Sequence, residues 1–331
     1  MQEPFRALWA EEESGGPYHV SLRDLKLSDL TPGDVRIRVS YSSLNYKDGL
    51  AVLRQGKIIR RFPLVCGIDL AGIVEESSSP EFKPGDPVLA TGQGLSETRC
   101  GGFSQVAQLP ADAVVPVPAA YDLRQAMALG TAGLTAMLSV MALEHHGVRK
   151  SPDEVVVSGA AGGVGSLGVM LLARAGYRVA ASTGRPQLHN WLRKLGASTI
   201  IERADLARAR PPLASERWAG GVDTVGGQTL VSMIVETASF GAVAACGMVA
   251  GAEIPLTVFP FILRNVSLLG VSSAWTPKKV RVAAWSRLAE ILPGGQVDEI
   301  SRVEPLSRIV ELSREILAGN IQGRVVLDVN A

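Results

Sequence analysis

Four glycines stand within seven residues between Gly159 and Gly165, directly after the β-branched run Val155–Val157. Behind them, apolar residues recur at helical spacing from Val164 to Ala175. Glycines at such a strand–helix turn let the backbone approach a pyrophosphate, and the first helical turn offers N–H groups to its charge. The segment therefore predicts a dinucleotide site. The residues expected to contact the phosphates are Ala161, Gly162, Gly163 and Val164.

Two other interpretations of this segment are open. It resembles an ordinary glycine-rich turn, and also a membrane span, because residues 155–173 carry no charge. The glycines stand together at its front, however, and the continuation is amphipathic. These features favour a dinucleotide site in a soluble fold, with no membrane partner.

The end of the second predicted strand, at 178–182, would contact the adenosine ribose. An acidic residue about 20 positions beyond the glycines would favour NAD by binding the ribose 2′-hydroxyl. This chain has no carboxylate there, and hydroxyls with an arginine suit a 2′-phosphate, because charge-assisted hydrogen bonds are strong. The residues expected around that phosphate are Ser182, Thr183, Gly184, Arg185 and Arg203. The sequence therefore favours NADPH, with solvated surface arginines as the alternative for Arg185 and Arg203.

The composition is that of a globular α/β protein long enough for two domains. The 331 residues are 47% hydrophobic and 20% charged, with a net charge of +1, so no global field favours nucleic acid or an anionic membrane. The three cysteines are far apart and lack metal-site spacing, which indicates a reducing compartment. The N-terminus has no signal-like organisation, so we expect a cytoplasmic protein.

The order of predicted elements defines the domains. The first 125 residues are mostly β and predict a compact barrel-like domain, and a helix follows at 123–143. Strands at 155–157, 178–182, 198–201, 221–225, 242–246 and 266–271 then alternate with helices, which predicts a doubly wound parallel sheet. The tail has helices at 280–292 and 306–318 and a strand at 324–329, expected to return to the first domain. We therefore expect domains at 1–124 with 273–331, and at 125–272.

Several segments together resemble a known family. Ser43–Asp48, Cys66–Gly72, Gly130–Ala136 and Gly162–Gly165 come in the order found in the medium-chain dehydrogenase/reductase superfamily, in its zinc-free quinone-oxidoreductase branch. Gly184-Arg185, Asp223–Gly227 and Gln322–Val326 are similar to the acrylyl-CoA reductase (NADPH) group. The resemblance implies a GroES-like, mostly β catalytic domain, an NADP-binding Rossmann domain and an active site in the cleft between them.

The resemblance also assigns residues to the cofactor. It implies that Tyr46 contacts the nicotinamide side and that Ser182, Gly184, Arg185 and Arg203 surround the 2′-phosphate. The residues implied along the rest of the cofactor groove are Cys246, Gly247, Ser272 and Asn320.

No metal is expected. Zinc alcohol dehydrogenases need a Cys or His ligand where Asn45-Tyr46 stands, and Gly-His-Glu where Gly67-Ile68-Asp69 stands. The four histidines lie outside both segments, and three scattered cysteines cannot form a structural zinc site. Cys66 is better explained as a small buried hydrophobe than as a ligand.

Without a Lewis acid, reduction of an activated C=C bond is easier to support than alcohol oxidation. Hydride goes to the β-carbon and the carbonyl takes the developing charge, so donors must face that oxygen. The candidates are Asn45 and Tyr46; Tyr46 could also donate the proton, and Asp48 could orient Lys47 or Tyr46. The alternatives are a packing aromatic for Tyr46 and a helix cap for Asp48.

The expected reaction is NADPH-dependent reduction of a short 2-enoyl thioester, acryloyl-CoA to propanoyl-CoA. The basic residues Arg54, Lys57, Arg60 and Arg61 could hold the phosphates of coenzyme A, and Arg324 is a further possible substrate anchor; simple solvation is the alternative. A broad NADPH:quinone or enone oxidoreductase and a non-enzymatic NADPH-binding protein remain the other classes. We also expect a homodimer formed through the apolar edge strand at 267–271.

Overall fold

The computed structural model describes residues 3–12, 16–150 and 153–331, and the chain forms two compact units. Unit 1 comprises Met1–Thr131, Ser273–Ala289 and Pro293–Ala331, and unit 2 comprises Ala132–Ser272 and Glu290–Leu292. The first division lies at 131/132, whereas the sequence places it at 124/125. Helix α2 (Leu123–His146) runs through it, and Gly130 interrupts the helical conformation just before it (φ 50°, ψ −149°).

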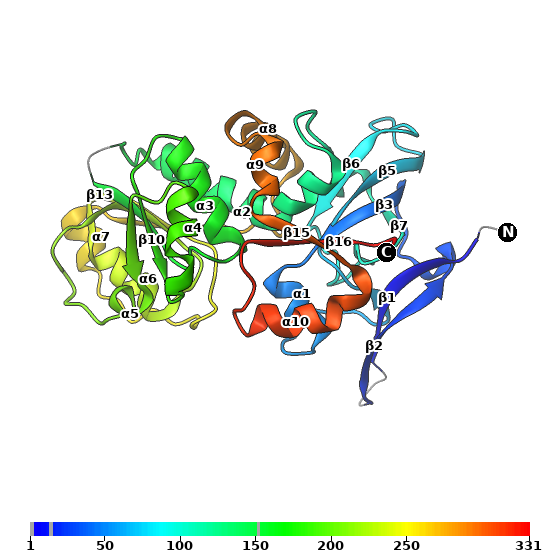
Figure 1. Cartoon of the computed structure of the whole chain (residues 1–331), viewed down its shortest axis with the longest axis horizontal. Coiled ribbons are helices and arrows are strands. Elements are labelled where there is room, and N and C mark those ends of the chain that lie inside the picture. The colour runs from blue at the N-terminus through cyan, green and yellow to red at the C-terminus, as the bar shows by residue number, and fades with distance from the viewer. Residues whose placement is uncertain (1–2, 13–15, 151–152) are drawn as a thin grey trace. The chain divides into compact units, whose positions relative to one another are not determined.

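Unit 2 is built on one parallel sheet of six strands (Figure 1). The strands are β9 (Glu154–Val157), β10 (Val179–Thr183), β11 (Thr199–Glu202), β12 (Trp218–Asp223), β13 (Thr237–Ala245) and β14 (Ser267–Gly270). Their order is β11-β10-β9-β12-β13-β14, with every neighbouring pair parallel. The order reverses between β9 and β12, which makes this a doubly wound Rossmann sheet and confirms the predicted fold.

The helices of unit 2 follow its strands and pack on the sheet. They are α3 (Gly163–Arg174), α4 (His189–Lys194), α5 (Arg203–Leu206), α6 (Gly227–Val235) and α7 (Phe259–Arg264). Val155–Val157 and all of β10 are buried, as expected for strands covered on both faces. The core of this unit gathers Val156, Ala180, Met233 and Val243 around Trp218.

Unit 1 contains two sheets. The smaller has the order β2-β1-β4, from β1 (Phe5–Glu12), β2 (Tyr18–Leu25) and β4 (Leu64–Val65). The larger has the order β15-β16-β3-β5-β6-β8, with β7 also paired to β3. Its strands are β3 (Val35–Ser43), β5 (Asp69–Ser77), β6 (Pro87–Thr91), β7 (Val106–Leu109), β8 (Val114–Pro116), β15 (Ser301–Pro305) and β16 (Arg324–Asp328). The closing strand β16 pairs antiparallel with β3, which confirms its predicted return to the first domain.

The further helices are α1 (Tyr46–Val52), α8 (Lys278–Ile291), α9 (Gly294–Asp298) and α10 (Ile309–Leu317). Helices α1 and α10 lie side by side (Figure 1), and a Cβ atom on Gly49 would come within 2.9 Å of Ile316. This close approach requires a glycine on α1. The packing matters for the site, because α1 begins at the Asn45–Asp48 segment.

The predicted boundaries of two strands are clearly wrong, and one of them is β13, which begins at Thr237 although the sequence places that strand at 242–246. The sequence places a strand at 221–225, whereas β12 runs from Trp218 to Asp223. Gly220, which the prediction left outside the strand, and Gly221 both lie within β12, where their neighbours leave no room for a side chain. A Cβ atom on Gly221 would lie 2.6 Å from the Met233 side chain and 3.1 Å from the Val156 carbonyl oxygen.

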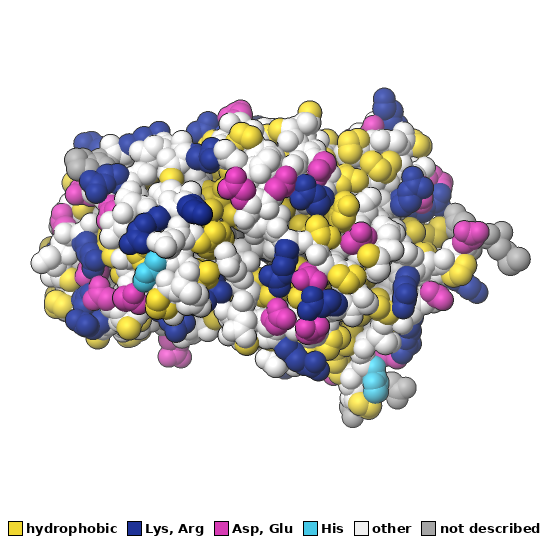
Figure 2. Space-filling model, viewed as in Figure 1, with side chains coloured by type: hydrophobic (Ala, Val, Ile, Leu, Met, Phe, Trp, Pro, Cys, Tyr) yellow, Lys and Arg dark blue, Asp and Glu magenta, His cyan; other side chains and the backbone are white. Residues whose placement is uncertain are grey.

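Charge is mixed on the surface seen in Figure 2, where acidic and basic side chains stand among one another. Several form ion pairs, for example Arg23 with Glu11 and Arg308 with Glu311. Among the described residues, α2 is the one helix with the length and hydropathy to cross a membrane. Since 78% of its apolar window is buried inside the protein, packing in the core accounts for that hydropathy.

Candidate functional site

The turn between β9 and α3 is held by glycines that no other residue could replace. Gly159 has a φ of +57°, and a Cβ atom on it would lie 2.4 Å from Thr224 Oγ1. A Cβ atom on Gly165 would lie 2.2 Å from the Gly159 carbonyl oxygen. Gly162 caps α3, and within the described chain the N–H groups of the next three residues donate to no protein acceptor. The turn can therefore receive an anion such as a pyrophosphate.

The residues after β10 form a small basic corner. The guanidinium of Arg203 lies against Gly184, where a Cβ atom would be 2.7 Å from Nε. Arg185 donates from Nη2 to the carbonyl oxygen of Ala161 in the glycine turn, at 2.7 Å. Burial and the neighbouring charge of Arg203 lower the pKa of Arg185. Because two guanidinium groups converge here, a bound anion would relieve their repulsion.

Hydroxyl groups line the same corner. Ser182 is only 2% exposed, and its hydroxyl has no hydrogen-bond partner within the described chain. The Thr183 hydroxyl accepts a hydrogen bond from the Arg185 backbone N–H at 3.2 Å. The structure thus brings together the predicted residues from Ser182 to Arg185, Arg203 and Ala161. Donors of this kind around a basic corner fit a phosphate group.

The ends of β12 and β13 lie beside the glycine turn, tied by a buried carboxylate. Asp223 accepts hydrogen bonds from Ser158 Oγ at 2.6 Å and from Gly226 N–H at 2.8 Å. Gly247 packs on the backbone of β12, since its Cβ atom would lie 2.0 Å from the Thr224 carbonyl oxygen. The Cys246 thiol donates a hydrogen bond to the Asp223 carbonyl oxygen, and burial raises the pKa of this thiol to about 12. No role for Asp223 was predicted from the sequence, although a carboxylate at a strand end before Gly226-Gly227 is a signal for one.

The two remaining residues of the predicted cofactor groove are exposed. Ser272 follows β14 in unit 2, at the carboxyl edge of the parallel sheet. Asn320 follows α10 in unit 1, and its N–H donates to the Glu315 carbonyl oxygen. Ligands of such sheets bind at the carboxyl edge, which suits the position of Ser272.

In unit 1, a buried polar network centres on Asp69, the first residue of β5. Asp69 accepts hydrogen bonds from Ser43 Oγ at 2.5 Å, from Asn45 Nδ2 at 2.8 Å and from the Thr131 N–H at 2.9 Å. Its other oxygen accepts from Thr131 Oγ1 at 2.5 Å. Gly130 is required beside it, since a Cβ atom there would lie 2.5 Å from Asp69 Oδ2.

Asp48 belongs to this network and does not orient Lys47 or Tyr46 as predicted. Its oxygens accept hydrogen bonds from the Asn45 N–H at 2.9 Å, Asn45 Nδ2 at 3.0 Å and the Ile68 N–H at 2.9 Å. Lys47 instead pairs with Glu97. Burial, together with the charge of Asp69, raises the pKa of Asp48 to about 7. Asp48 closes the first turn of α1, the capping role that was the alternative interpretation.

Asn45 also differs from its predicted role. Its side-chain N–H groups donate to Asp48 and Asp69, two buried carboxylates that need donors, so they do not face a substrate oxygen. Tyr46, the first residue of α1, is 37% exposed and has no hydrogen bond within the described chain. Tyr46 is therefore the side chain of this segment that can meet a substrate.

The prediction that Arg324 anchors the substrate is wrong. Arg324 is 3% exposed, and its guanidinium donates to the carbonyl oxygens of Ala128 at 2.9 Å and Leu44 at 3.0 Å, and to Ser43 Oγ at 3.1 Å. Burial lowers the pKa of Arg324, while the charges of Asp69 and Asp48 oppose that shift. Each of its three guanidinium nitrogens donates a hydrogen bond inside unit 1, because β16 lies beside β3.

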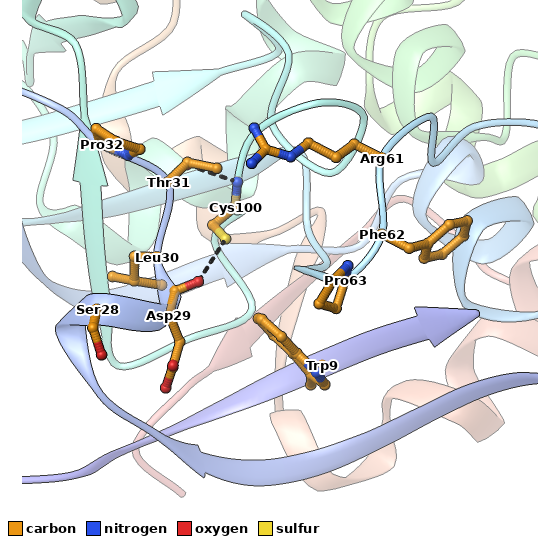
Figure 3. A pocket seen from close by; sticks show the side chains of 10 residues that line it. All are labelled: Trp9, Ser28, Asp29, Leu30, Thr31, Pro32, Arg61, Phe62, Pro63 and Cys100. Atoms are coloured by element: carbon orange, nitrogen blue, oxygen red, sulfur yellow. Dashed lines mark hydrogen bonds between the residues drawn. The ribbon is translucent and has the colours of Figure 1, made fainter. Parts of the chain in front are cut away.

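The predicted basic cluster divides into two parts. Arg54 pairs with Glu12 and lies over the rings of Tyr18 and Phe62, with its Cζ 5.6 and 5.2 Å from their centroids. Lys57, Arg60 and Arg61 are exposed, and none of the three has an ion-pair partner within the described residues. Arg61 lines a pocket of about 300 Å³ (Figure 3).

Two segments of the chain match known protein families. Residues 31–119 match the alcohol dehydrogenase GroES-like domain, and residues 163–290 match the zinc-binding dehydrogenase family. In the described part of this chain, no three His, Cys, Asp or Glu residues are grouped so that they could hold a metal ion.

Relatives match over the whole chain. Acrylyl-CoA reductase AcuI of Ruegeria pomeroyi is 47% identical over 329 residues, covering 99% of this chain and 100% of that protein. The structure of Escherichia coli YhdH with bound NADPH is 45% identical, with a TM-score of 0.94 over 98% of this chain and 100% of that one. Bacillus subtilis YhfP with NAD bound is 42% identical, with a TM-score of 0.94 over 99% and 100%. The chain therefore belongs to the medium-chain dehydrogenase/reductase superfamily, in the group that includes the acrylyl-CoA reductase AcuI.

Proposed function

We propose that this protein is an NADPH-dependent reductase of short 2-enoyl thioesters that converts acryloyl-CoA to propanoyl-CoA. Unit 2 is its cofactor-binding domain and unit 1 its GroES-like catalytic domain. The choice of NADPH as the cofactor rests on one observation. The guanidinium of Arg203 lies against Gly184, and that of Arg185 bonds the adjacent glycine turn. The substrate class rests on the relative from Ruegeria pomeroyi, which matches the chain from end to end.

The cofactor choice depends on charge at that corner. Of the two structures compared above, one holds NADPH and the other NAD, so overall likeness does not decide between them. A 2′-phosphate would receive charge-assisted N–H donors from Arg185 and Arg203, whereas a neutral 2′-hydroxyl would gain less from two neighbouring guanidinium groups. The pyrophosphate would lie on the N–H groups of Gly163 and Val164, in the first turn of α3.

Bound NADPH supplies the hydride that adds to the β-carbon of the substrate. The chain must then hold the thioester carbonyl as it gains charge and deliver a proton to the α-carbon. Tyr46 is the candidate for this proton, because its hydroxyl is exposed at the start of α1. Within the described chain, the side chains of Asn45 and Asp48 make no hydrogen bond to Tyr46; they hold the first turn of α1, where Tyr46 stands, by hydrogen bonds to one another.

Steady-state NADPH oxidation with acryloyl-CoA, crotonyl-CoA and 1,4-benzoquinone, measured side by side, tests the proposal. We expect the highest kcat/KM for acryloyl-CoA, and a Tyr46→Phe variant with a lower kcat and a similar KM. A quinone with the higher kcat/KM would instead support the alternative, a quinone or enone oxidoreductase. NADPH binding without turnover of any of the three would leave a non-enzymatic NADPH-binding protein.

A homodimer in the cytoplasm is the expected form of the enzyme. Strand β14 is the last strand of its sheet, so one of its edges is unpaired within unit 2. Beside it, α7 exposes Ile262 and Leu263 by 65% and 61%. Pairing of β14 with its twin across a two-fold axis would extend the sheet and cover these side chains.

A further inference from the structure

The pocket that Arg61 lines belongs to unit 1 and includes none of the residues placed above at the cofactor or at the reacting carbons. The residues that matter for its chemistry are Trp9, Asp29, Thr31, Arg61, Phe62 and Cys100, and its volume is about 300 Å³. Figure 3 shows Arg61 reaching across it toward Thr31 and Cys100, with Trp9 on the opposite side. We call it the Trp9 pocket. Its size is at the lower end of the range for small-molecule sites, about 300–1,000 Å³.

The walls of the Trp9 pocket are fixed by contacts within the protein. Thr31 Oγ1 accepts a hydrogen bond from the Cys100 N–H at 3.1 Å, which ties two sides together. The ring of Phe62 is held by Arg54, which itself pairs with Glu12. Because these contacts form without a ligand, a ligand would bind with little ordering of the walls.

Positive charge gathers on one side of the pocket. Lys57, Arg60 and Arg61 are exposed, and Arg99, next to Cys100, is half-buried. None of these four cations has an ion-pair partner within the described residues, although many other arginines of the chain do. The Arg60 N–H donates to the Glu97 carbonyl oxygen at 2.8 Å. This bond brings the segment with Lys57, Arg60 and Arg61 close to Arg99. Arginine is well suited to bind phosphate, because its donors match phosphate oxygens in pairs.

The other end of the pocket suits a base rather than a phosphate. Trp9 offers an aromatic face, and stacking of a nucleobase on such a face contributes about 1–3 kcal/mol. Asp29 is exposed on the same side and offers carboxylate oxygens, one of which accepts the Lys26 N–H at 2.7 Å. A carboxylate can accept hydrogen bonds from the exocyclic amine of adenine. The pocket therefore combines acceptors and an aromatic face at one end with cations at the other.

We propose that the Trp9 pocket binds the 3′-phosphoadenosine diphosphate end of coenzyme A. Adenine lies against Trp9 and Asp29, and the phosphates lie on Arg60, Arg61 and Arg99. The inference rests on the proposed function, since it names where the thioester substrate is held. Glu97 connects the two sites within unit 1, because it pairs with Lys47, next to Tyr46, and also bonds the backbone of Arg60.

Two substrates with the same reactive end test the pocket. Acryloyl-pantetheine lacks the nucleotide that acryloyl-CoA carries, so only the CoA ester can use the pocket. In the unmutated enzyme, kcat/KM should be at least tenfold higher for the CoA ester. The double variant Arg60→Ala/Arg61→Ala should lose about that factor for the CoA ester, through KM, and nothing for the pantetheine ester. Both side chains are exposed and unpaired, so the fold does not depend on them.

A second double variant controls for net charge. Arg38→Ala/Arg302→Ala removes two charges from exposed arginines of β3 and β15, and both esters should react with it as with the unmutated enzyme. Equal kcat/KM for the two esters, or equal losses for both in Arg60→Ala/Arg61→Ala, would overturn the pocket assignment and leave the reductase standing.

Direct binding separates this inference from the proposed function. With unit 2 saturated by NADP⁺, calorimetric titration with adenosine 3′,5′-bisphosphate should show one site, weakened at least tenfold in Arg60→Ala/Arg61→Ala. Adenosine 5′-monophosphate, which lacks the second phosphate, should bind more weakly. If neither ester is reduced, the proposed function fails, and this titration still decides the pocket. Absence of bisphosphate binding to the unmutated protein would overturn it.

Discussion

Replacing Arg324 with methionine distinguishes a structural arginine from a substrate anchor. The guanidinium donates to two buried carbonyl oxygens and one buried hydroxyl, and it interacts electrostatically with Asp69 and Asp48. Removing one partner of a buried charge group costs about 3–5 kcal/mol, and each buried acceptor left unpaired costs about 1–3 kcal/mol. Methionine recovers part of this by filling the volume. We therefore expect a loss of about 4 kcal/mol in the stability of unit 1.

Thermal unfolding measures this loss. For a domain of 150–250 residues, about 1 kcal/mol corresponds to 2–4 °C, so Tm should fall by about 8–16 °C. Arg324→Lys keeps a charge but loses the fixed geometry of three donors, and its Tm should lie between the other two. Kinetics at a temperature where the variant is folded should show a similar KM for acryloyl-CoA. An unchanged Tm with a raised KM would refute the structural role and restore the substrate anchor.

Three further predictions concern the cofactor, pH and assembly. NADPH should bind at least tenfold tighter than NADH (about 1.4 kcal/mol), and Arg185→Ala should remove most of this preference; equal dissociation constants in the unmutated protein would contradict it. The pKa of Asp48 is raised from 3.8 to about 7, so the native state keeps a proton that the unfolded chain loses. Stability should therefore fall as pH rises through about 7, in thermal unfolding between pH 5 and 9, and less steeply in Asp48→Asn; parallel profiles would exclude Asp48 as the source. Light scattering at micromolar concentration should give a dimer, and Ile262→Asp a monomer, whereas a monomer before mutation would refute the interface.

The parallel sheet was predictable because its signals are local. Val155–Val157 is a β-branched run, and the glycines that follow can only be a close turn. The basic corner was visible for the same reason, since Ser182–Arg185 is continuous in the chain. The start of β12 was placed too late because Gly220 and Gly221 lack the β-branched side chains that mark a buried strand.

The buried network of unit 1 was not predictable, because it depends on strand pairing. The Arg324 guanidinium reaches the Ser43 hydroxyl only because β16 pairs with β3. In that pairing Val326 stands opposite Ser43. Likewise, the partner of Lys47 is Glu97, which stands 50 positions away in the sequence. Residue type alone suggested that an arginine and a carboxylate near the site would face the substrate. Burial showed that Arg324 and Asp48 stabilise the fold instead.

That network also constrains how the protein can change over evolutionary time. Ser43 and Asn45, Asp69, and Arg324 come from three separate parts of the gene, yet each satisfies a buried group of another. A mutation in one of them leaves its partner's charge or donor unpaired, so the single mutant carries a stability penalty before any compensating change arises. Descendants of this gene should therefore keep these positions together or replace them together. New chemistry is easier to reach through Tyr46 and the Trp9 pocket, where a side chain can change without disturbing the interior.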